Sequence, residues 1–349
     1  MISFLIVGSG YRAEFYARIA RKYSTLFRAM FLCRSEEKAA AVEQRTGVKG
    51  MTSLESALAF HPDFIVSAVD NKHVGDVTEE WVQHGFPVLA ETPVGSSVEQ
   101  LERLWKLQQE KGALISCAEQ YHRYPILAEG IRRVESGLIG QPCSIYLSLA
   151  HEYHGFSLIK RILQTTGEEY TMVAVRQRSE TVATDSRYGA ILDGSNAQEE
   201  RYIAYITFSS GKTAIYDFAD LQYRSFIRSR HLTVRGERGE WNDRIMSFVD
   251  ADNKPGRICL MPEIPDRFQQ LDTQTLRDGR KTWTPELFLD TEQDEFAAAS
   301  ILLDMGAYIT GGPSPYPLEE ALEDAYFCLL LRQAVEQPFQ EVTGGMKRR

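Results

Sequence analysis

A glycine-rich turn eight residues from the start of the chain restricts the fold more than any other feature. It follows the apolar run Ile2–Val7 and opens a helical pattern. In a G-x-G-x-x-A turn the first glycine permits a sharp bend, the second lets the backbone approach a pyrophosphate, and the small third residue lets helix and strand touch. Backbone N–H groups at the helix start then face the anion. The expected nucleotide-binding positions are Gly8, Ser9, Gly10, Tyr11, Arg12 and Ala13.

The first 120 residues alternate short apolar runs with helical patterns, which predicts crossovers and a parallel sheet covered on both faces. The apolar runs are Ile2–Val7, Ala29–Cys33, Phe64–Val69, Val88–Ala90 and Leu114–Cys117. The helical patterns are Ala13–Tyr23, Glu36–Thr46, Ser53–Ala59, Val74–His84 and Val98–Lys111. We therefore predict an α/β protein whose residues 1–120 form a doubly wound, Rossmann-type NAD(P)-binding domain.

The pattern changes in the second domain, residues 121–349. After a helix near Pro125–Ser136, the segment Ser144–Leu149 alternates apolar and polar residues, which is typical of a sheet with one buried face. Further expected strands are Tyr170–Arg178, Tyr202–Ser209, Thr213–Phe218 and His231–Val234. The residues from Asp250 to Thr284 are interpreted as loop. Two helices, from Thr291 and from Leu318, close the chain and either stay with this domain or pack back on the first.

Composition limits the classes of function. The 349 residues are 43% hydrophobic and 25% charged, as in soluble globular proteins. The formal charge of −9 disfavours nucleic-acid binding, because no basic excess exists to displace counterions. No apolar run approaches the roughly 20 residues that a membrane span needs. The five scattered cysteines show no metal-ligand or disulfide spacing, so we expect a cytoplasmic protein without a metal site.

The end of the second strand bears on the choice between NAD and NADP. An Asp or Glu there would bind the ribose 2′-hydroxyl, but Cys33 occupies that position and Arg34 offers a fork suited to a phosphate. This favours NADP slightly over NAD. The alternative is that Ser35 caps a helix whose carboxylates, Glu36 and Glu37, would repel a 2′-phosphate.

Several short motifs occur in the order and spacing of one protein family. They are Gly8–Ala13, the segment Cys33–Ala39, Glu91-Thr92-Pro93, Ala118–Pro125 with Gly137–Gly140, and Val234–Gly239. Together they resemble the Gfo/Idh/MocA family of glucose-fructose oxidoreductases and inositol dehydrogenases. The resemblance implies a C-terminal α/β domain built on a large, open, mainly antiparallel sheet that substrates contact and that pairs subunits into homodimers or homotetramers. It also implies hydride exchange between a nicotinamide and a carbohydrate-like alcohol or ketone.

The resemblance also identifies positions of a reaction centre, and the chain departs from most of them. The family's E-K-P motif reads Glu91-Thr92-Pro93 here, so Thr92 replaces its lysine. In the family's Asp-x-x-x-His-x-x-Asp group, Ala150 and Ser157 replace the aspartates and His154 matches the histidine. His154 is then the expected proton-transfer residue. The Thr92 hydroxyl could hydrogen-bond substrate or nicotinamide, while Glu91 and Pro93 are expected to position the cofactor.

Other polar residues surround these positions. His151 and Tyr153 flank His154; an extended backbone would put them on one side and His154 on the other, and a turn at Gly155 would relax this. Glu119 and Tyr121 follow the last strand of the first domain, where ligands bind in open parallel sheets. The expected substrate-contacting residues are Glu119, Tyr121, His151 and His154, with His154, Tyr153 and Thr92 as the catalytic group. Lys160 is interpreted as a solvated lysine.

The sequence thus predicts an NAD(P)-dependent oxidoreductase acting on CH–OH groups of a carbohydrate-like substrate. Two alternatives stay open. One is a redox-cycling enzyme that cleaves a glycoside by transient oxidation and elimination, with no net change of the nicotinamide. The other is a non-catalytic nucleotide-binding sensor on the same scaffold, suggested by the three substituted positions of the reaction centre.

Overall fold

The computed structural model describes residues 1–186, 189–261 and 291–345. By residue contacts the chain divides into two compact units. The first comprises Met1–Gln120 and Thr291–Tyr326, and the second comprises Tyr121–Asp290 and Phe327–Arg349. Each is described below by itself.

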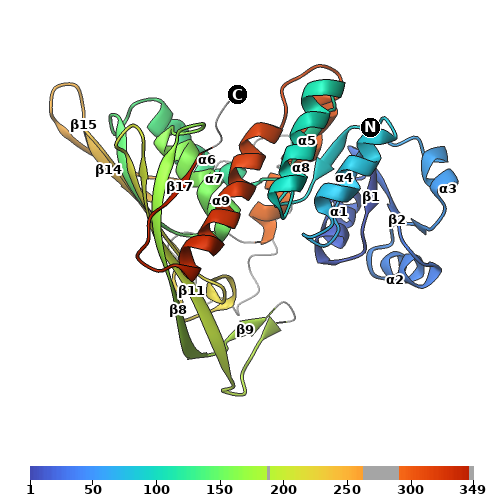
Figure 1. Ribbon diagram of the computed structural model, residues 1–349, viewed down its shortest axis with the longest axis horizontal. Coiled ribbons are helices and arrows are strands. Elements are labelled where there is room, and N and C mark those ends of the chain that lie inside the picture. The colour runs from blue at the N-terminus through green and yellow to red at the C-terminus, as the bar shows by residue number, and fades with distance from the viewer. Residues whose placement is uncertain (187–188, 262–290, 346–349) are drawn as a thin grey trace. The chain divides into compact units, whose positions relative to one another are not determined.

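The first unit contains a six-stranded sheet in the order β3-β2-β1-β4-β5-β6 with every pairing parallel. Strands β1 and β2 of this sheet are labelled in Figure 1. The strands of the sheet are β1 (Ile2–Val7), β2 (Phe27–Leu32), β3 (Gly50–Met51), β4 (Phe64–Ser67), β5 (Val88–Ala90) and β6 (Ile115–Cys117). This order confirms the predicted doubly wound sheet and places its switch point between β1 and β4. Strand β3 was not predicted, because a two-residue strand has no readable period.

Five helices connect these strands: α1 (Tyr11–Lys22), α2 (Glu36–Thr46), α3 (Leu54–Ala59), α4 (Val74–Gln83) and α5 (Val98–Lys111). Ser35, Ser53 and Ser97 cap three of them, each accepting a hydrogen bond from a backbone N–H of the first turn. Gly47 and Gly112 end α2 and α5 in the left-handed conformation. These local signals explain why the predicted helix boundaries lie within about two residues of the observed ones.

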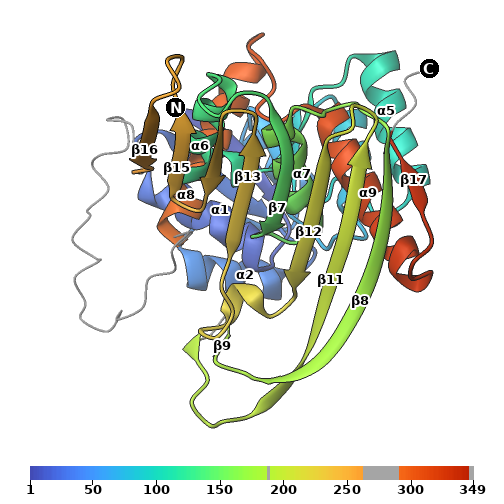
Figure 2. The same ribbon diagram turned by 90° about the vertical axis from the view of Figure 1, so that its left-hand side faces the viewer.

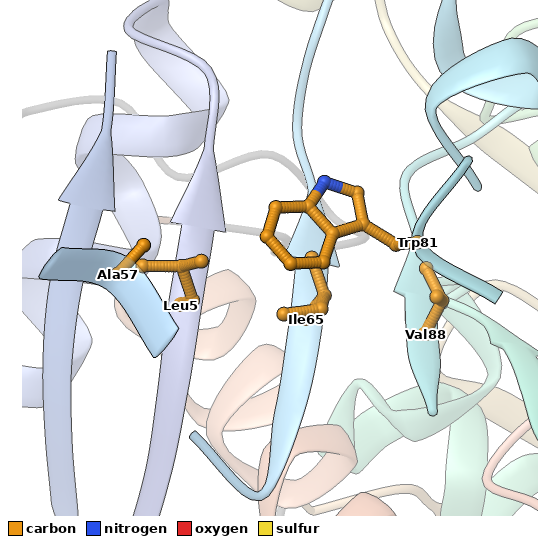
Figure 3. Close-up of a cluster of buried hydrophobic side chains, with 5 residues drawn as sticks. All are labelled: Leu5, Ala57, Ile65, Trp81 and Val88. Atoms are coloured by element: carbon orange, nitrogen blue, oxygen red, sulfur yellow. The ribbon is translucent and has the colours of Figure 1, made fainter. Parts of the chain in front are cut away.

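Part of the core forms where helices pack on one face of the parallel sheet (Figure 3). Leu5, Ile65 and Val88 come from three neighbouring strands and are fully buried. Ala57 of α3 and Trp81 of α4 pack over them. Burying these side chains stabilises the unit by roughly 1.5–3 kcal/mol for each large one.

Helix α8 (Thr291–Tyr308) also belongs to the first unit. Its Gly306 lies against Ile2 of β1, where an added Cβ would come within 2.4 Å of the isoleucine side chain. Lys22 of α1 donates to Glu295 of α8 at 2.6 Å. The chain therefore returns to the N-terminal sheet after residue 290, and α9 (Leu318–Glu336) is divided between the units after Tyr326.

The second unit is built on a nine-stranded sheet within the described residues, in the order β16-β15-β14-β13-β7-β12-β11-β8-β17 (Figure 2). The strands are β7 (Pro142–Ser148), β8 (Tyr170–Val182), β11 (Asn196–Phe208), β12 (Thr213–Ala219), β13 (His231–Gly236), β14 (Gly239–Asn242), β15 (Ile245–Val249), β16 (Pro255–Cys259) and β17 (Val342–Gly344). The β7–β12 pairing is parallel and the others are antiparallel. The predicted mainly antiparallel second domain is confirmed.

The predicted bounds of two strands and the interpretation of one segment as loop need correction. Strands β8 and β11 pair over thirteen residues each and extend beyond their neighbours, with β9 (Asp185–Ser186) and β10 (Gly189–Ala190) forming a small sheet between them (Figure 2). The interpretation of residues 250–284 as loop is wrong for β16, and residues 262–284 lie outside the described part. Pro255 and Gly256 argued against a strand here, because both residues are unfavourable within strands. An edge strand nevertheless tolerates a proline at its first position.

One face of this sheet is covered by α6 (Pro125–Glu135) and α7 (Glu152–Leu163). Gly130 of α6 lies against Trp241 of β14, and an added Cβ would meet the indole ring at 2.2 Å. Phe156 of α7 stacks on Phe327 with centroids 4.2 Å apart. The opposite face exposes 52% of Tyr205; subunit pairing through this face stays a prediction.

Candidate active site

The turn before α1 has the geometry of an anion-binding loop. Gly8 has a φ of +134°, and a Cβ there would lie 2.1 Å from the carbonyl oxygen of Ala68. Gly10 is the N-cap of α1 and makes no side-chain cap, and a Cβ on it would meet nothing within 4 Å. No side chain at Gly10 therefore covers the N-terminal end of α1. Ala13 is fully buried, as contact between helix and sheet requires.

These residues fit the pyrophosphate of a dinucleotide. The helix N-terminus supplies N–H donors and a partial positive charge, and Gly10 leaves the room that a phosphate needs. Tyr11 begins α1 and is 43% exposed.

Arg12 is part of a buried charge network. Its Nε donates to Glu91 Oε1 at 2.9 Å, and its Nη1 lies 3.2 Å from Asp294 Oδ2 of α8. Tyr16 donates to the same Glu91 oxygen at 2.6 Å, and Gln120 donates to Asp294 at 3.0 Å. The helix that carries the glycine turn is thereby tied to the end of β5 and to α8.

Glu91 is held as a carboxylate inside this network. Burial alone would raise its pKa, but the charge of Arg12 and the hydrogen bonds from Tyr16, Arg12 and the Thr92 backbone outweigh burial and lower the pKa. The Thr92 N–H donates to Oε2 at 3.1 Å, and the Thr92 hydroxyl lies 3.4 Å from the same atom. Thr92 is buried and precedes a cis peptide bond to Pro93. Glu91 is therefore suited to fixing this loop and unsuited to accepting a proton.

The three residues after β2 that the sequence singled out for cofactor choice differ in burial and in their contacts. Cys33 is buried, and burial raises the pKa of its thiol. Arg34 is exposed. Ser35 caps α2 by accepting from Lys38 N at 3.3 Å, as the alternative interpretation of the sequence required. Of the three, Arg34 and Ser35 are exposed, and Arg34 carries a positive charge.

Glu119 and Gln120, just after β6, are almost fully buried in the first unit. Glu119 contributes to raising the pKa of the Cys117 thiol, after burial itself. The neighbouring substrate candidate, Tyr121, belongs to the second unit. The two substrate candidates Glu119 and Tyr121 are thus assigned to different units.

In the second unit, three tyrosine side chains form a hydrogen-bonded chain with His151. The Tyr223 oxygen accepts from the Tyr121 hydroxyl at 2.9 Å and from the backbone N–H of His151 at 2.8 Å. Its own proton is then directed to His151 Nδ1, 2.8 Å away. The proton of the neutral imidazole consequently lies on Nε2, which donates to the Tyr153 hydroxyl at 2.9 Å.

Burial, with a smaller contribution from His154, lowers the pKa of His151 well below its usual value. The ring is therefore neutral at neutral pH, in agreement with the hydrogen-bond pattern. Burial likewise raises the pKa of Tyr223 well above its usual value, so its hydroxyl keeps the proton that it donates. The chain from Tyr121 to Tyr153 is thus a fixed, uncharged arrangement.

His154 lies in the first turn of α7 beside this chain. It is 5% exposed, and its ring centroid lies 4.4 Å from that of Tyr121, 4.5 Å from Tyr153 and 4.9 Å from His151. Because α7 begins at Glu152, the helix brings the three rings together, and the extended arrangement considered from the sequence does not occur.

The first residue of α7 is held in an unusual conformation. Glu152 has a φ of +35°, uncommon for a residue with a side chain. Its N–H donates to the Tyr216 hydroxyl at 2.6 Å, and its carboxylate accepts from Arg332 at 3.0 Å. These contacts hold the chain where it turns from His151 into the helix.

The positions of the two missing family aspartates carry no acid. Ala150 is fully buried, and the Ser157 hydroxyl donates to the backbone oxygen of His154 at 2.9 Å. Lys160, interpreted as solvated, is only 2% exposed, and its Nζ lies 5.4 Å from the Phe156 ring centroid. That interpretation is wrong because tertiary packing buries α7 from Tyr153 to Lys160 and again at Ile162 and Leu163, polar residues included.

Sequence reasoning missed Tyr223 and Tyr216. Tyr223 lies in a short 3-10 turn, Gln222–Arg224, and Tyr216 on β12. Neither has a local motif, and only the strand alternation of β12 marked Tyr216 as buried. Across residues 1–186, 189–261 and 291–345, no group of three or more His, Cys, Asp or Glu side chains is placed to hold a metal ion. Within the same residues, no helix is long and apolar enough to cross a membrane.

Comparison with known proteins matches residues 2–119 to the model of an oxidoreductase family with an NAD-binding Rossmann fold, the Gfo/Idh/MocA family. No curated protein matches the sequence.

Solved structures are similar over nearly the whole chain. A levoglucosan dehydrogenase in complex with NADH and levoglucosan has a TM-score of 0.71 at 13% identity, covering 99% of this chain and 100% of that one. A putative myo-inositol dehydrogenase from Sinorhizobium meliloti 1021 has a TM-score of 0.68 at 14% identity, covering 99% and 100%. An oxidoreductase from Agrobacterium radiobacter, in complex with NAD+, L-tartaric acid and magnesium, has a TM-score of 0.68 at 12% identity, covering 98% of both chains. At such identities the similarity shows the shared fold.

Proposed function

We propose that the protein is an NAD(P)-dependent oxidoreductase of carbohydrate-like alcohols or ketones, and the match of residues 2–119 to the Gfo/Idh/MocA family model supports this. The observation that carries the proposal is the turn at Gly8–Gly10. It combines a backbone that only glycine tolerates, an uncapped helix N-terminus and open space for a phosphate at the switch point of the parallel sheet.

Oxidation of an alcohol releases a hydride, which a bound nicotinamide accepts, and a proton, which the protein must take. We assign the proton to His154, because imidazole exchanges protons near neutral pH. Tyr153, fixed by the neutral His151, orients the substrate oxygen through its hydroxyl. Thr92 carries no charge and contacts Glu91, so its proposed role is to maintain the loop that borders the cofactor.

Arg34 supports a preference for NADP. It is exposed at the end of β2, where the buried Cys33 offers no carboxylate to a ribose hydroxyl. If Arg34 binds a 2′-phosphate, Arg34→Ala should raise the Kd for NADP+ by about tenfold and leave the Kd for NAD+ nearly unchanged. Tighter binding of NAD+ than of NADP+ by the unaltered protein would contradict the preference.

The test of function is hydride exchange with a panel of sugars, polyols and their ketones, followed by the absorbance of the reduced nicotinamide. His154→Ala should lower kcat by about a hundredfold or more and leave the cofactor Kd unchanged. His84→Gln, at an exposed histidine after α4, is the control and should behave as the unaltered protein. Unchanged turnover in His154→Ala would remove the assignment of His154.

A second candidate function is a nucleotide-binding sensor without turnover. The observations that favour it are Ala150, the backbone-bonded Ser157 and the uncharged Thr92 at three positions of the family's reaction centre. It predicts cofactor binding with no hydride exchange for any substrate in the panel. Cleavage of a glycoside without a net change of nicotinamide would identify the redox-cycling alternative.

A further inference from the structure

A pocket of about 370 Å³ opens in the second unit next to the aromatic chain. Its lining comes from the start of α7, from β11 and β12, and from the turn that carries Tyr223. His151 and Tyr223 form one side of it, so the fixed hydrogen-bonded chain borders the pocket. The volume lies in the range of small-molecule sites, roughly 300–1,000 Å³.

Aromatic rings form much of the lining. Tyr216 and Phe218 lie two apart on β12 and therefore point to the same face of the sheet. They are 1% and 4% exposed, whereas Tyr202 of β11 and Tyr223 are half-buried. Flat, apolar surfaces of this kind suit the C–H face of a saturated ring, and a phenol adds a hydroxyl at its edge.

Carboxylates supply the polar part of the lining. Glu152 accepts from Arg332 at 3.0 Å, and Glu200 accepts from Arg178 Nε at 3.0 Å. The arginines balance both charges yet leave further lone pairs that can accept from hydroxyl groups. Asp220 is exposed and accepts from the backbone N–H of Glu200 at 3.1 Å.

The charge of the lining discriminates between ligands. Among the described residues that line the pocket there is no lysine or arginine, and the arginines that pair with Glu152 and Glu200 lie outside the lining, so a ligand carboxylate or phosphate would meet acceptor oxygens and no lining cation. An ammonium group would gain little, because two of the carboxylates are already paired and the third is screened by solvent. Ligand hydroxyl groups can donate hydrogen bonds to the oxygens of all three carboxylates without a charge penalty.

We propose that this pocket binds an uncharged polyhydroxylated ring, a neutral glycoside or polyol, in preference to the corresponding acid or amine. The proposal rests on the proposed function, because it names the charge class of the same carbohydrate-like substrate. The ring lies against Tyr202 and Tyr223, and its hydroxyls donate to Glu152, Glu200 and Asp220. Sugar acids and nucleotide-linked sugars are excluded as preferred ligands of this pocket.

Ligand-observed NMR on the full chain without nicotinamide tests the proposal separately from catalysis. The probes are myo-inositol and the methyl glycosides of glucose, galactose, mannose and xylose, with the uronic acid and amino-sugar analogues of the glucose and galactose forms. At least one neutral probe should bind about tenfold more tightly than its charged analogues. Absence of binding by every neutral probe, or equal binding of a charged analogue, overturns the proposal.

Variants then assign the binding to this pocket. Tyr202→Ala should weaken the best neutral probe by about tenfold, because it removes a ring face from the lining. Tyr202→Leu, which keeps apolar volume, is the second variant and guards against a folding defect. Tyr205→Ala is the matched control, since Tyr205 lies on the same strand with 52% of its surface exposed on the opposite face. Loss of binding in the control, or full binding in both Tyr202 variants, overturns the assignment.

The outcomes also separate this proposal from the proposed function. A neutral probe that binds but is never oxidised supports the pocket and contradicts the oxidoreductase. Turnover of a neutral sugar with a KM unaffected by either Tyr202 variant supports the oxidoreductase and contradicts the pocket.

Discussion

Around Gly10 in the first unit, charged groups fix one another, whereas around His151 in the second unit uncharged rings and hydroxyls have that role. Arg12 is held between Glu91 and Asp294. His151 is held between Tyr223 and Tyr153. The first arrangement suits an anionic cofactor, because an ion-paired frame keeps the helix N-terminus as the positive end that is open to a ligand. The second suits a proton transfer, because neutral neighbours add no charge of their own. The electrostatic energy of the site then depends on the charge of the reacting group.

The largest effect should come from the turn of the first unit. Gly8→Ala should cost about 4 kcal/mol of unfolding free energy or prevent folding, because its Cβ would meet the Ala68 carbonyl at 2.1 Å in a conformation strained for alanine. Gly10→Ala should change stability by less than about 0.5 kcal/mol but raise the Kd for NAD+ about tenfold. Chemical denaturation and cofactor titration measure both, and equal stability losses would contradict the distinction.

Breaking the charge network should cost nearly as much. Arg12→Leu leaves the buried Glu91 without its counter-charge and should lower the unfolding free energy by about 3 kcal/mol. Arg45→Leu is the control, because Arg45 is 50% exposed in its pair with Glu14 and should contribute less than about 0.5 kcal/mol. A loss for Arg12→Leu no larger than for the control would show that the network does not hold the turn.

A smaller loss is expected from the uncharged chain of the second unit. Tyr223→Phe removes the acceptor for Tyr121 and for the His151 N–H, and should cost about 1.5 kcal/mol. It also removes the donor to His151 Nδ1, so the pKa of His151 should rise, as NMR titration of the ring would detect. Tyr205→Phe, at an exposed tyrosine, should change neither quantity. An unchanged His151 titration would mean that Tyr223 does not fix the tautomer.

The smallest effects are expected in acid titration of stability, which should distinguish the two regions by the pH range in which each loses stability. The pKa of His151 is lowered in the folded state. Below about pH 6.5 the unfolded chain therefore binds a proton that the folded chain does not bind, and the free energy of unfolding decreases as the pH decreases. The lowered pKa of Glu91 has the same consequence, but only below its usual value of 4.5. His151→Gln should therefore flatten the stability profile between about pH 6.5 and 5, and Glu91→Gln only at lower pH. A single shared pH range would contradict the assignment.

Much of the first unit is readable from sequence because its determinants are local. The glycines of the turn, the serine caps and the apolar periods each act within a few residues of themselves, so they predicted five of six strands and all five helices. The resemblance placed His154, Glu91 and Thr92 as candidates in the same way, by motif.

The sequence alone therefore determined the doubly wound sheet and the glycine turn before α1, since backbone conformation and hydrophobic period are properties of short segments. Tertiary structure decided the rest. Tyr223 meets His151 across 72 positions of sequence, and no local pattern specifies such a pair. Strand β16 forms because its backbone pairs with β15 at the edge of the sheet. Lys160 is buried because nearly all of α7 is buried. These outcomes depend on which surfaces meet when the chain packs, and that is fixed by long-range contacts.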